Sequence, residues 1–182
     1  MKETNKTNVN NMVLAALFLC IGLILPFFTG NIPQIGSMLL PMHIPVLLCG
    51  IILGAKYGAL IGFILPLTRF FMVGMPPLFP TAISMTFELA TYGLIIGILY
   101  NKLPKTAPAL YASLLGAMVV GRLVWGATRV VMMGLTDVAF SFELFMAGAV
   151  INALPGIVLQ IIFVPSLVMV LRKAGWRREQ FA

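Results

Sequence analysis

Six long runs of apolar residues, separated by short breaks rich in glycine and proline, constrain this sequence more than any other feature. A helix needs roughly 20 apolar residues to cross the hydrocarbon core of a membrane. The breaks contain residues that often end helices, such as Gly30, Pro33, Pro76 and Pro108. We therefore predict an all-α fold, with residues 1–182 forming one integral membrane domain. The six predicted transmembrane helices cover approximately 12–29, 37–54, 57–74, 80–100, 107–134 and 144–171.

The composition excludes a soluble fold. Hydrophobic residues make up 60% of the 182 residues and charged residues only 9%, whereas a soluble domain carries about 25% charged residues. So few polar side chains cannot cover a surface that faces water on all sides. The run at 12–29 lacks a small-residue cleavage site and is followed by further runs, so we interpret it as a retained span and not as a signal peptide.

The positions of the basic residues predict the orientation. With six spans, nine of the twelve Lys and Arg residues fall on one side of the membrane, and the links on the other side carry only Asp137 and Glu143. Because cytoplasmic loops are enriched in Lys and Arg, we predict that both termini are cytoplasmic. The net charge of +7 then reflects topology and not a nucleic-acid groove. The nine residues are Lys2, Lys6, Lys56, Lys102, Lys105, Arg172, Lys173, Arg177 and Arg178.

Polar side chains inside the spans predict a pocket. Ionisable groups at membrane depth cost at least a few kcal/mol and usually face a bundle interior or a cavity. At a rise of about 1.5 Å per residue, six antiparallel spans place six of the seven polar groups in the outer half of the bundle. We therefore predict a polar cavity open to the outside. The six are His43, Arg69, Glu88, Arg122, Arg129 and Asn152, and the seventh, Gln160, belongs to the inner half.

Two helix faces carry most of the predicted site, because their polar residues recur at helical spacing. Trp125 between two arginines suits a flat ligand, and guanidinium groups can hold a carboxylate. Three arginines against one glutamate leave positive charge for a ligand to neutralise, so we expect a carboxylate; a neutral ligand stays open. The two stripes are Arg122, Trp125, Gly126 and Arg129 on one span and Ser84, Glu88 and Thr91 on another.

The same polar residues also have structural interpretations. Arg69 and Arg129 could extend to the outer headgroups. Glu88 and Arg122 could form a purely structural ion pair. His43 lies at the end of a predicted helix and could be a structural hydrogen-bonding group. The sequence leaves these alternatives open.

Glycines predict where the helices pack most closely. Small residues let helix backbones approach one another, and here they recur at every fourth position. They are Gly50, Gly54, Gly58 and Gly62 around the link between the second and third runs, and Gly93 and Gly97 in the fourth run.

Motifs of enzymes and nucleotide-binding proteins are missing from the sequence. It contains no GxxxxGK[ST] loop, no HExxH and no GxSxG. Cys20 and Cys49 lie in apolar runs without CxxC spacing, so we expect neither a disulfide nor a metal site. We expect no cofactor and no enzymatic activity in this chain.

Three segments resemble the substrate-binding S components of energy-coupling factor (ECF) vitamin transporters. They are residues 40–63 (LPMHIPVLLCGIILGAKYGALIGF), 76–100 and 152–160 (NALPGIVLQ). The length, the six runs, the basic ends and the short N-terminal tail agree with that family, so the resemblance covers essentially the whole chain. The shared patterns of glycine, proline and apolar residues are specific to the family and do not name a vitamin.

The resemblance implies a division of labour. An S component captures a vitamin or vitamin precursor outside the cell with high affinity, then docks on a membrane scaffold (T) subunit that carries two cytoplasmic ATPases. This would explain the missing nucleotide motif. We expect a multi-pass protein of the bacterial plasma membrane, in contact with lipid and not with nucleic acid. The first candidate substrates to test are carboxylates of the size of nicotinate or pantothenate. A neutral pyridoxine or pyrimidine vitamer is an alternative substrate.

The resemblance also implies which residues act. The substrate of an S component lies in the outer half, among the fourth to sixth helices, under the first and third loops, here residues 31–37 and 75–80. The scaffold docks on an AxxxA pair of the first helix, for which this chain has Ala16 and Cys20. Together with the residues deduced above, the predicted substrate-binding set is Asn31, Gln34, Arg69, Ser84, Glu88, Thr91, Arg122, Trp125, Arg129 and Asn152.

Two other functions compete with this interpretation. A stand-alone secondary carrier would use Glu88 as a proton site and would take up its substrate without partners. A membrane enzyme or assembly factor would show turnover or a protein partner but no tightly bound vitamin. Uptake that requires separate ATPase subunits would distinguish the S component from both.

Overall fold

The computed structural model describes residues 2–29, 32–134 and 141–175. Asp137, Arg177 and Arg178, which the topology prediction uses, lie outside these ranges. The described residues form helices and no β-strand, which confirms the all-α fold class. In chain order the elements are α1 (Lys2–Ile24), η1 (Leu25–Thr29), α2 (Pro33–Leu39), α3 (His43–Leu53), α4 (Ala55–Val73), η2 (Leu78–Ala82), α5 (Ile83–Lys102), α6 (Ala107–Gly134), α7 (Phe142–Met146), η3 (Ala147–Ile151) and α8 (Leu154–Lys173).

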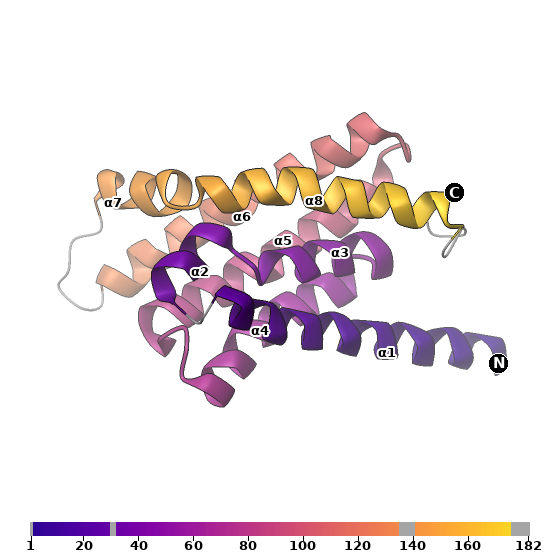
Figure 1. Cartoon of the computed structure of the whole chain (residues 1–182), viewed down its shortest axis with the longest axis horizontal. Coiled ribbons are helices and arrows are strands. Elements are labelled where there is room, and N and C mark those ends of the chain that lie inside the picture. The colour runs from indigo at the N-terminus through magenta and orange to yellow at the C-terminus, as the bar shows by residue number, and fades with distance from the viewer. Residues whose placement is uncertain (1, 30–31, 135–140, 176–182) are drawn as a thin grey trace.

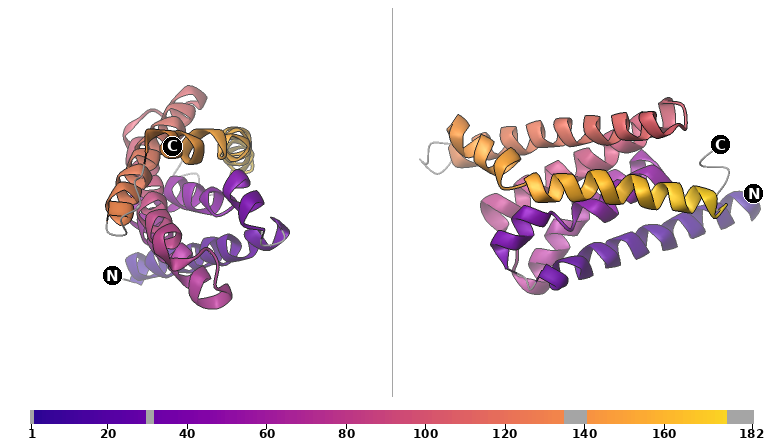
Figure 2. Two further views of the ribbon diagram at one scale, coloured as in Figure 1. Left: turned by 90° about the vertical axis from the view of Figure 1, so that its left-hand side faces the viewer. Right: turned by 45° about the horizontal axis from the view of Figure 1, so that its top comes forward.

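The helices run along the long axis of the molecule and form a bundle (Figures 1 and 2). The start of α1 and the end of α8 lie at one end of the bundle, and α2 and α7 lie at the other (Figure 1). Five helical stretches in the described residues are long and apolar enough to cross a membrane. They are Val9–Phe28, Ala55–Val73, Leu78–Lys102, Ala107–Gly134 and Ala147–Lys173, and they correspond to five of the six predicted spans.

The second predicted span, 37–54, is not one continuous helix. Helix α2 ends at Leu39 and α3 begins at His43, and Leu40 between them has a left-handed backbone with φ 50°. Pro41 explains the break, because a proline disfavours helical geometry in the residue before it and cannot donate a backbone hydrogen bond. With 11 residues, α3 is about 16 Å long at roughly 1.5 Å per residue, about half the hydrocarbon thickness of ~30 Å.

Helix α3 lies at the centre of the bundle. Every residue from His43 to Leu53 is buried, and α3 packs against α1, α4, α5 and α8. A helix surrounded by other helices has no lipid-facing side that would need the full membrane thickness. The sixth predicted span, 144–171, is also interrupted: a π-helical turn, η3, and a turn at Asn152 and Ala153 precede α8.

The predicted glycine contacts are confirmed where α3, α4 and α5 meet. A Cβ atom added to Gly58 would lie 2.7 Å from the Cα atom of Gly50 and 2.7 Å from the carbonyl oxygen of Gly93. Real Cβ atoms essentially never come within 3.0 Å of such atoms. The tight turn between α3 and α4 is made at Gly54, whose φ of 88° favours glycine.

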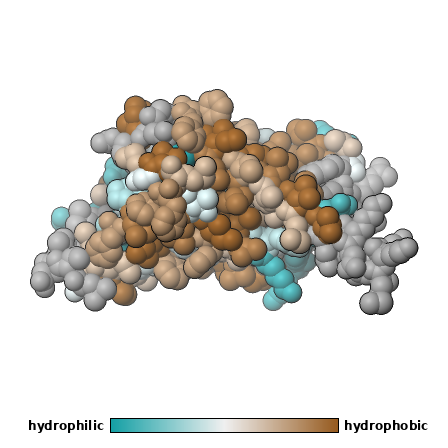
Figure 3. All heavy atoms as spheres, turned by 90° about the horizontal axis from the view of Figure 1, so that it is seen from below, coloured by the Kyte–Doolittle hydropathy of each residue, from teal (hydrophilic) through white to brown (hydrophobic). Residues whose placement is uncertain are grey.

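The outside of the bundle is apolar. Side chains such as Val13, Leu17, Phe63 and Leu123 are exposed, and one face seen from below is largely hydrophobic across its middle (Figure 3). Soluble monomers rarely expose contiguous apolar patches larger than a few hundred Å². This surface therefore suits lipid.

Basic residues tie helices together at the end where α8 finishes. Arg172 donates hydrogen bonds to the Lys105 carbonyl oxygen (2.8 Å) and to the Tyr100 hydroxyl. The Lys105 amine donates to the Tyr100 carbonyl oxygen at 2.6 Å. Burial, and then the nearby charge of Arg172, lower the pKa of Lys105. These residues therefore join α8 to the α5–α6 link as well as marking the basic side of the protein.

We expect the substitution Gly93→Leu to destabilise the fold. Its side chain would need space that the Gly58 backbone occupies, and overpacking a core costs about 1–3 kcal/mol. Thermal unfolding in detergent measures the effect. Gly134→Ala is the control, because its added Cβ would meet nothing within 4 Å. Equal melting temperatures for Gly93→Leu and the unsubstituted protein would contradict the close approach.

Candidate functional site

A cavity of about 480 Å³ opens at the end of the bundle opposite the start of α1 and the end of α8. Its lining comes from η1, α2, the α2–α3 link, α3, α4, the α4–α5 segment, α5, α6 and η3. Typical small-molecule pockets measure about 300–1,000 Å³. The predicted clustering of polar residues at one end of the bundle is therefore matched by a cavity of suitable size.

Glu88 of α5 is the centre of the polar lining. Its oxygen Oε1 lies 3.0 Å from Nη1 of Arg122 on α6 and 3.3 Å from Nε2 of His43 on α3. The side chains of Glu88 and His43 are 1% and 0% exposed. The ring of Tyr92, one turn further along α5, packs edge-on against the His43 ring with centroids 5.0 Å apart. The arginine that pairs with Glu88, which the sequence left open, is Arg122.

Arg122 and Arg129 both have hydrogen-bond donors without acceptors. Nη2 of Arg129 donates to the Thr81 hydroxyl at 3.3 Å, and its guanidinium lies 5.2 Å from the Trp125 ring centroid. Nε of Arg129 and both Nε and Nη2 of Arg122 are buried and make no well-aligned hydrogen bond among the described residues, although the Arg122 guanidinium lies near the Tyr92 hydroxyl. Most buried polar groups in proteins are hydrogen-bonded. Missing acceptors on two arginines that line one cavity therefore indicate space for an acceptor group.

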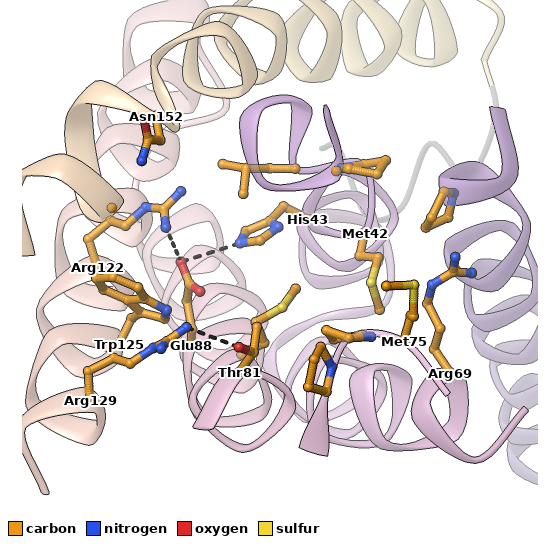
Figure 4. Close-up of a pocket in the computed structure, with 18 of the residues that line it drawn as sticks. Met42, His43, Arg69, Met75, Thr81, Glu88, Arg122, Trp125, Arg129 and Asn152 are labelled. Carbon is orange, nitrogen blue, oxygen red and sulfur yellow. Dashed lines mark hydrogen bonds and ion pairs between the residues drawn. The ribbon is translucent and has the colours of Figure 1, made fainter. Parts of the chain in front are cut away.

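Arg69 of α4 lies apart from this cluster, across the cavity (Figure 4). It is 3% exposed, its Nη1 donates to the Leu23 carbonyl oxygen at 2.8 Å, and its guanidinium lies 5.0 Å from the Phe27 ring centroid. Such burial rules out extension to the outer headgroups. Arg69 lines the cavity and also ties the end of α1 to α4.

The other residues of the predicted site fall into three groups. Asn152 and Trp125 line the cavity. Ser84 and Thr91 are outside its lining, and their hydroxyls donate to carbonyl oxygens of their own helical segment. Asn31 lies outside the described residues, as does the side chain of Gln34.

Sequence reasoning missed part of the lining. On α5 and the preceding turn the cavity-facing stripe is Thr81, Met85 and Glu88, not Ser84, Glu88 and Thr91. Both sets have helical spacing, so periodicity by itself cannot choose between them. The apolar walls, which include Met42 and Met75, also gave no distinct signal, because methionine is common in ordinary cores.

Comparison with known families identifies the kind of protein that has this cavity. Residues 10–168 match the family described as the substrate-specific component of ECF transporters. The chain belongs to this family. The resemblance predicted from residues 40–63, 76–100 and 152–160 is thereby confirmed. No curated protein and no solved structure matches the chain.

The family explains several features of this S component. S components are the substrate-binding subunits of ECF importers and not enzymes, and the family implies a small-molecule substrate and an ECF module of T and ATPase subunits. A multi-pass membrane protein with a cavity that contains charged side chains suits that task. The family does not name the substrate.

Proposed function

We propose that this S component captures a small vitamin or vitamin precursor that carries a carboxylate group. The observation that carries the proposal is the set of unmade hydrogen bonds on Arg122 and Arg129. A buried donor without a partner costs about 1–3 kcal/mol, and more when the group is charged. A carboxylate has two oxygens that accept such bonds. It would therefore supply acceptors for the arginine donors that lack them.

The charge of the cavity supports an anion. The lining contains Arg69, Arg122 and Arg129 against Glu88, so these four side chains carry 3 − 1 = +2. Glu88 neutralises Arg122 in part, so Arg129, above the Trp125 ring, is the stronger anchor for a ligand. The methionine and proline walls suit an apolar or flat body. Nicotinate and pantothenate are the first candidates of suitable size.

Mass spectrometry tests this proposal directly. The protein is purified in detergent and denatured, and the released small molecules are identified; we expect a carboxylate. Binding of nicotinate and pantothenate is then followed by tryptophan fluorescence or calorimetry.

We expect Arg122→Ala and Arg129→Ala each to weaken a bound carboxylate at least tenfold, because a hydrogen bond to a charged group contributes about 1.5–3 kcal/mol. Lys102→Ala, an exposed basic residue at the other end of α5, is the control. Unchanged affinity in both arginine variants would defeat the carboxylate proposal and leave family membership intact.

We further propose that the cavity faces outward and that both termini are cytoplasmic, in a bacterial plasma membrane. Lys102 ends α5 and Lys105 follows it, at the end away from the cavity, whereas Glu143 lies in α7 at the cavity end. Basic residues concentrate on the cytoplasmic side, so they support this orientation.

Cysteine labelling in intact cells tests the orientation. We expect a membrane-impermeant maleimide to label Glu143→Cys, and to label Lys102→Cys only after the membrane is opened. The unsubstituted protein, with Cys20 and Cys49, supplies the background. The reverse pattern would show that the cavity faces the cytoplasm.

For the docking of the ECF scaffold subunit we propose the outer face of α1. Ala16 and Cys20 are both exposed, and their i, i+4 spacing places them on one face of the helix. Small residues there leave room for a partner helix to approach closely.

We expect Ala16→Leu to reduce the amount of co-expressed T and ATPase subunits that co-purify with the tagged S component. Ala112→Leu, an exposed alanine on α6, is the matched control. Substrate binding by the isolated S component should be unchanged in both. Equal recovery of the partner subunits with both variants would place the docking surface elsewhere.

A further inference from the structure

We propose that Glu88 recognises a hydrogen-bond donor on the substrate, so that the substrate carries an N–H or O–H group besides its carboxylate. This inference rests on the proposed function and narrows the class of molecule that the cavity accepts. It concerns the one acidic side chain in the described lining of the cavity.

The two close polar contacts of Glu88 involve the same oxygen. Both Arg122 and His43 approach Oε1. The second oxygen, Oε2, points away from both partners toward the middle of the cavity (Figure 4). Both ion-pair distances recorded for Glu88 in the described residues involve Oε1, so Oε2 remains as an acceptor on the cavity wall.

Three helices hold the Glu88 carboxylate in this orientation. Arg122 reaches it from α6 and His43 from α3, and the His43 ring is packed against Tyr92 of α5. His43 and Tyr92 are both 0% exposed, so this arrangement has little freedom to move. His43 is therefore a positioning residue. It helps to direct Oε2 of Glu88 toward the substrate, and Oε2 is the atom that accepts the hydrogen bond.

The chemistry of a carboxylate oxygen determines what can bind beside it. An ionised carboxylate only accepts hydrogen bonds. A substrate donor facing Oε2 gains a charge-assisted bond, whereas a substrate acceptor there is repelled, and that repulsion is a source of specificity. The cavity thus offers donors on Arg122 and Arg129 and an acceptor on Glu88, and the matching ligand has both kinds of group.

This requirement separates the two carboxylates of suitable size. Pantothenate carries an amide N–H and hydroxyl groups in addition to its carboxylate. Nicotinate at neutral pH has a carboxylate and a ring nitrogen, which are both acceptors. The position of Glu88 Oε2 therefore favours a carboxylate that also carries a hydroxyl or amide N–H group over an aromatic carboxylate without such a donor.

The test is a comparison of how Glu88→Gln changes the affinities for pantothenate and for nicotinate, measured by calorimetry. The substitution removes the charged acceptor and releases Arg122 from its ion pair. We expect the affinity for pantothenate to fall about tenfold or more, and that for nicotinate to stay unchanged or rise. Glu143→Gln, the same substitution at an exposed acidic residue outside the cavity lining, is the control and should change neither.

Glu88→Asp is a second variant for the case that Glu88→Gln does not fold. It keeps the negative charge, but its side chain is one methylene shorter, so the carboxylate lies further from the substrate. It should also weaken pantothenate more than nicotinate. An unchanged ratio of the two affinities, in whichever of these variants folds, would overturn the role of Glu88 and leave the proposed function standing. No binding of either compound to the unsubstituted protein, together with no carboxylate among the molecules released on denaturation, would instead defeat the carboxylate proposal, and this inference with it.

Discussion

The backbone contact among α3, α4 and α5 is the constraint on which the rest of this structure depends. Gly58 and Gly93 have no side chains, so the backbones of α4 and α5 touch directly, and Gly50 brings α3 against the same point. The contact between Glu88 and His43 lies only one to two turns away along α5 and α3. Because the backbones meet there, a carboxylate and an imidazole on different helices come within 3.3 Å of each other.

The shape of the cavity depends on an interruption between two helices as well as on this packing. Pro41 separates α2 from α3. Helix α3 therefore starts at His43, nearer the middle of the bundle than α2. A continuous helix over 37–54 would occupy part of the space that now belongs to the cavity. Instead, α2 and the α2–α3 link become part of the lining. Pro41 thus lies both at the break between the two helices and in the lining of the cavity.

The two ends of the bundle differ in how they use their charged residues. At the end where α8 finishes, Arg172 and Lys105 have acceptors on the protein itself, so they close the structure. In the cavity, Arg122 and Arg129 retain buried donors without acceptors in the described chain. The first set of residues ties helices together, whereas the second set lines a cavity. This difference supports placing substrate capture at the cavity end.

The sequence alone determined the fold class, five of the membrane-spanning stretches, the family and the proximity of Glu88, Arg122, Trp125 and Arg129, which line one cavity. It could do so because apolar run length, helical spacing and the high cost of burying a charge are local or one-dimensional properties. Only the tertiary structure decided that Arg122 pairs with Glu88, that Arg69 lies apart, and that Thr81 and Met85 face the cavity instead of Ser84 and Thr91. Those outcomes depend on the rotation of each helix about its axis and on the distances between helices. Both are fixed by packing between residues far apart in the chain, which no local pattern records.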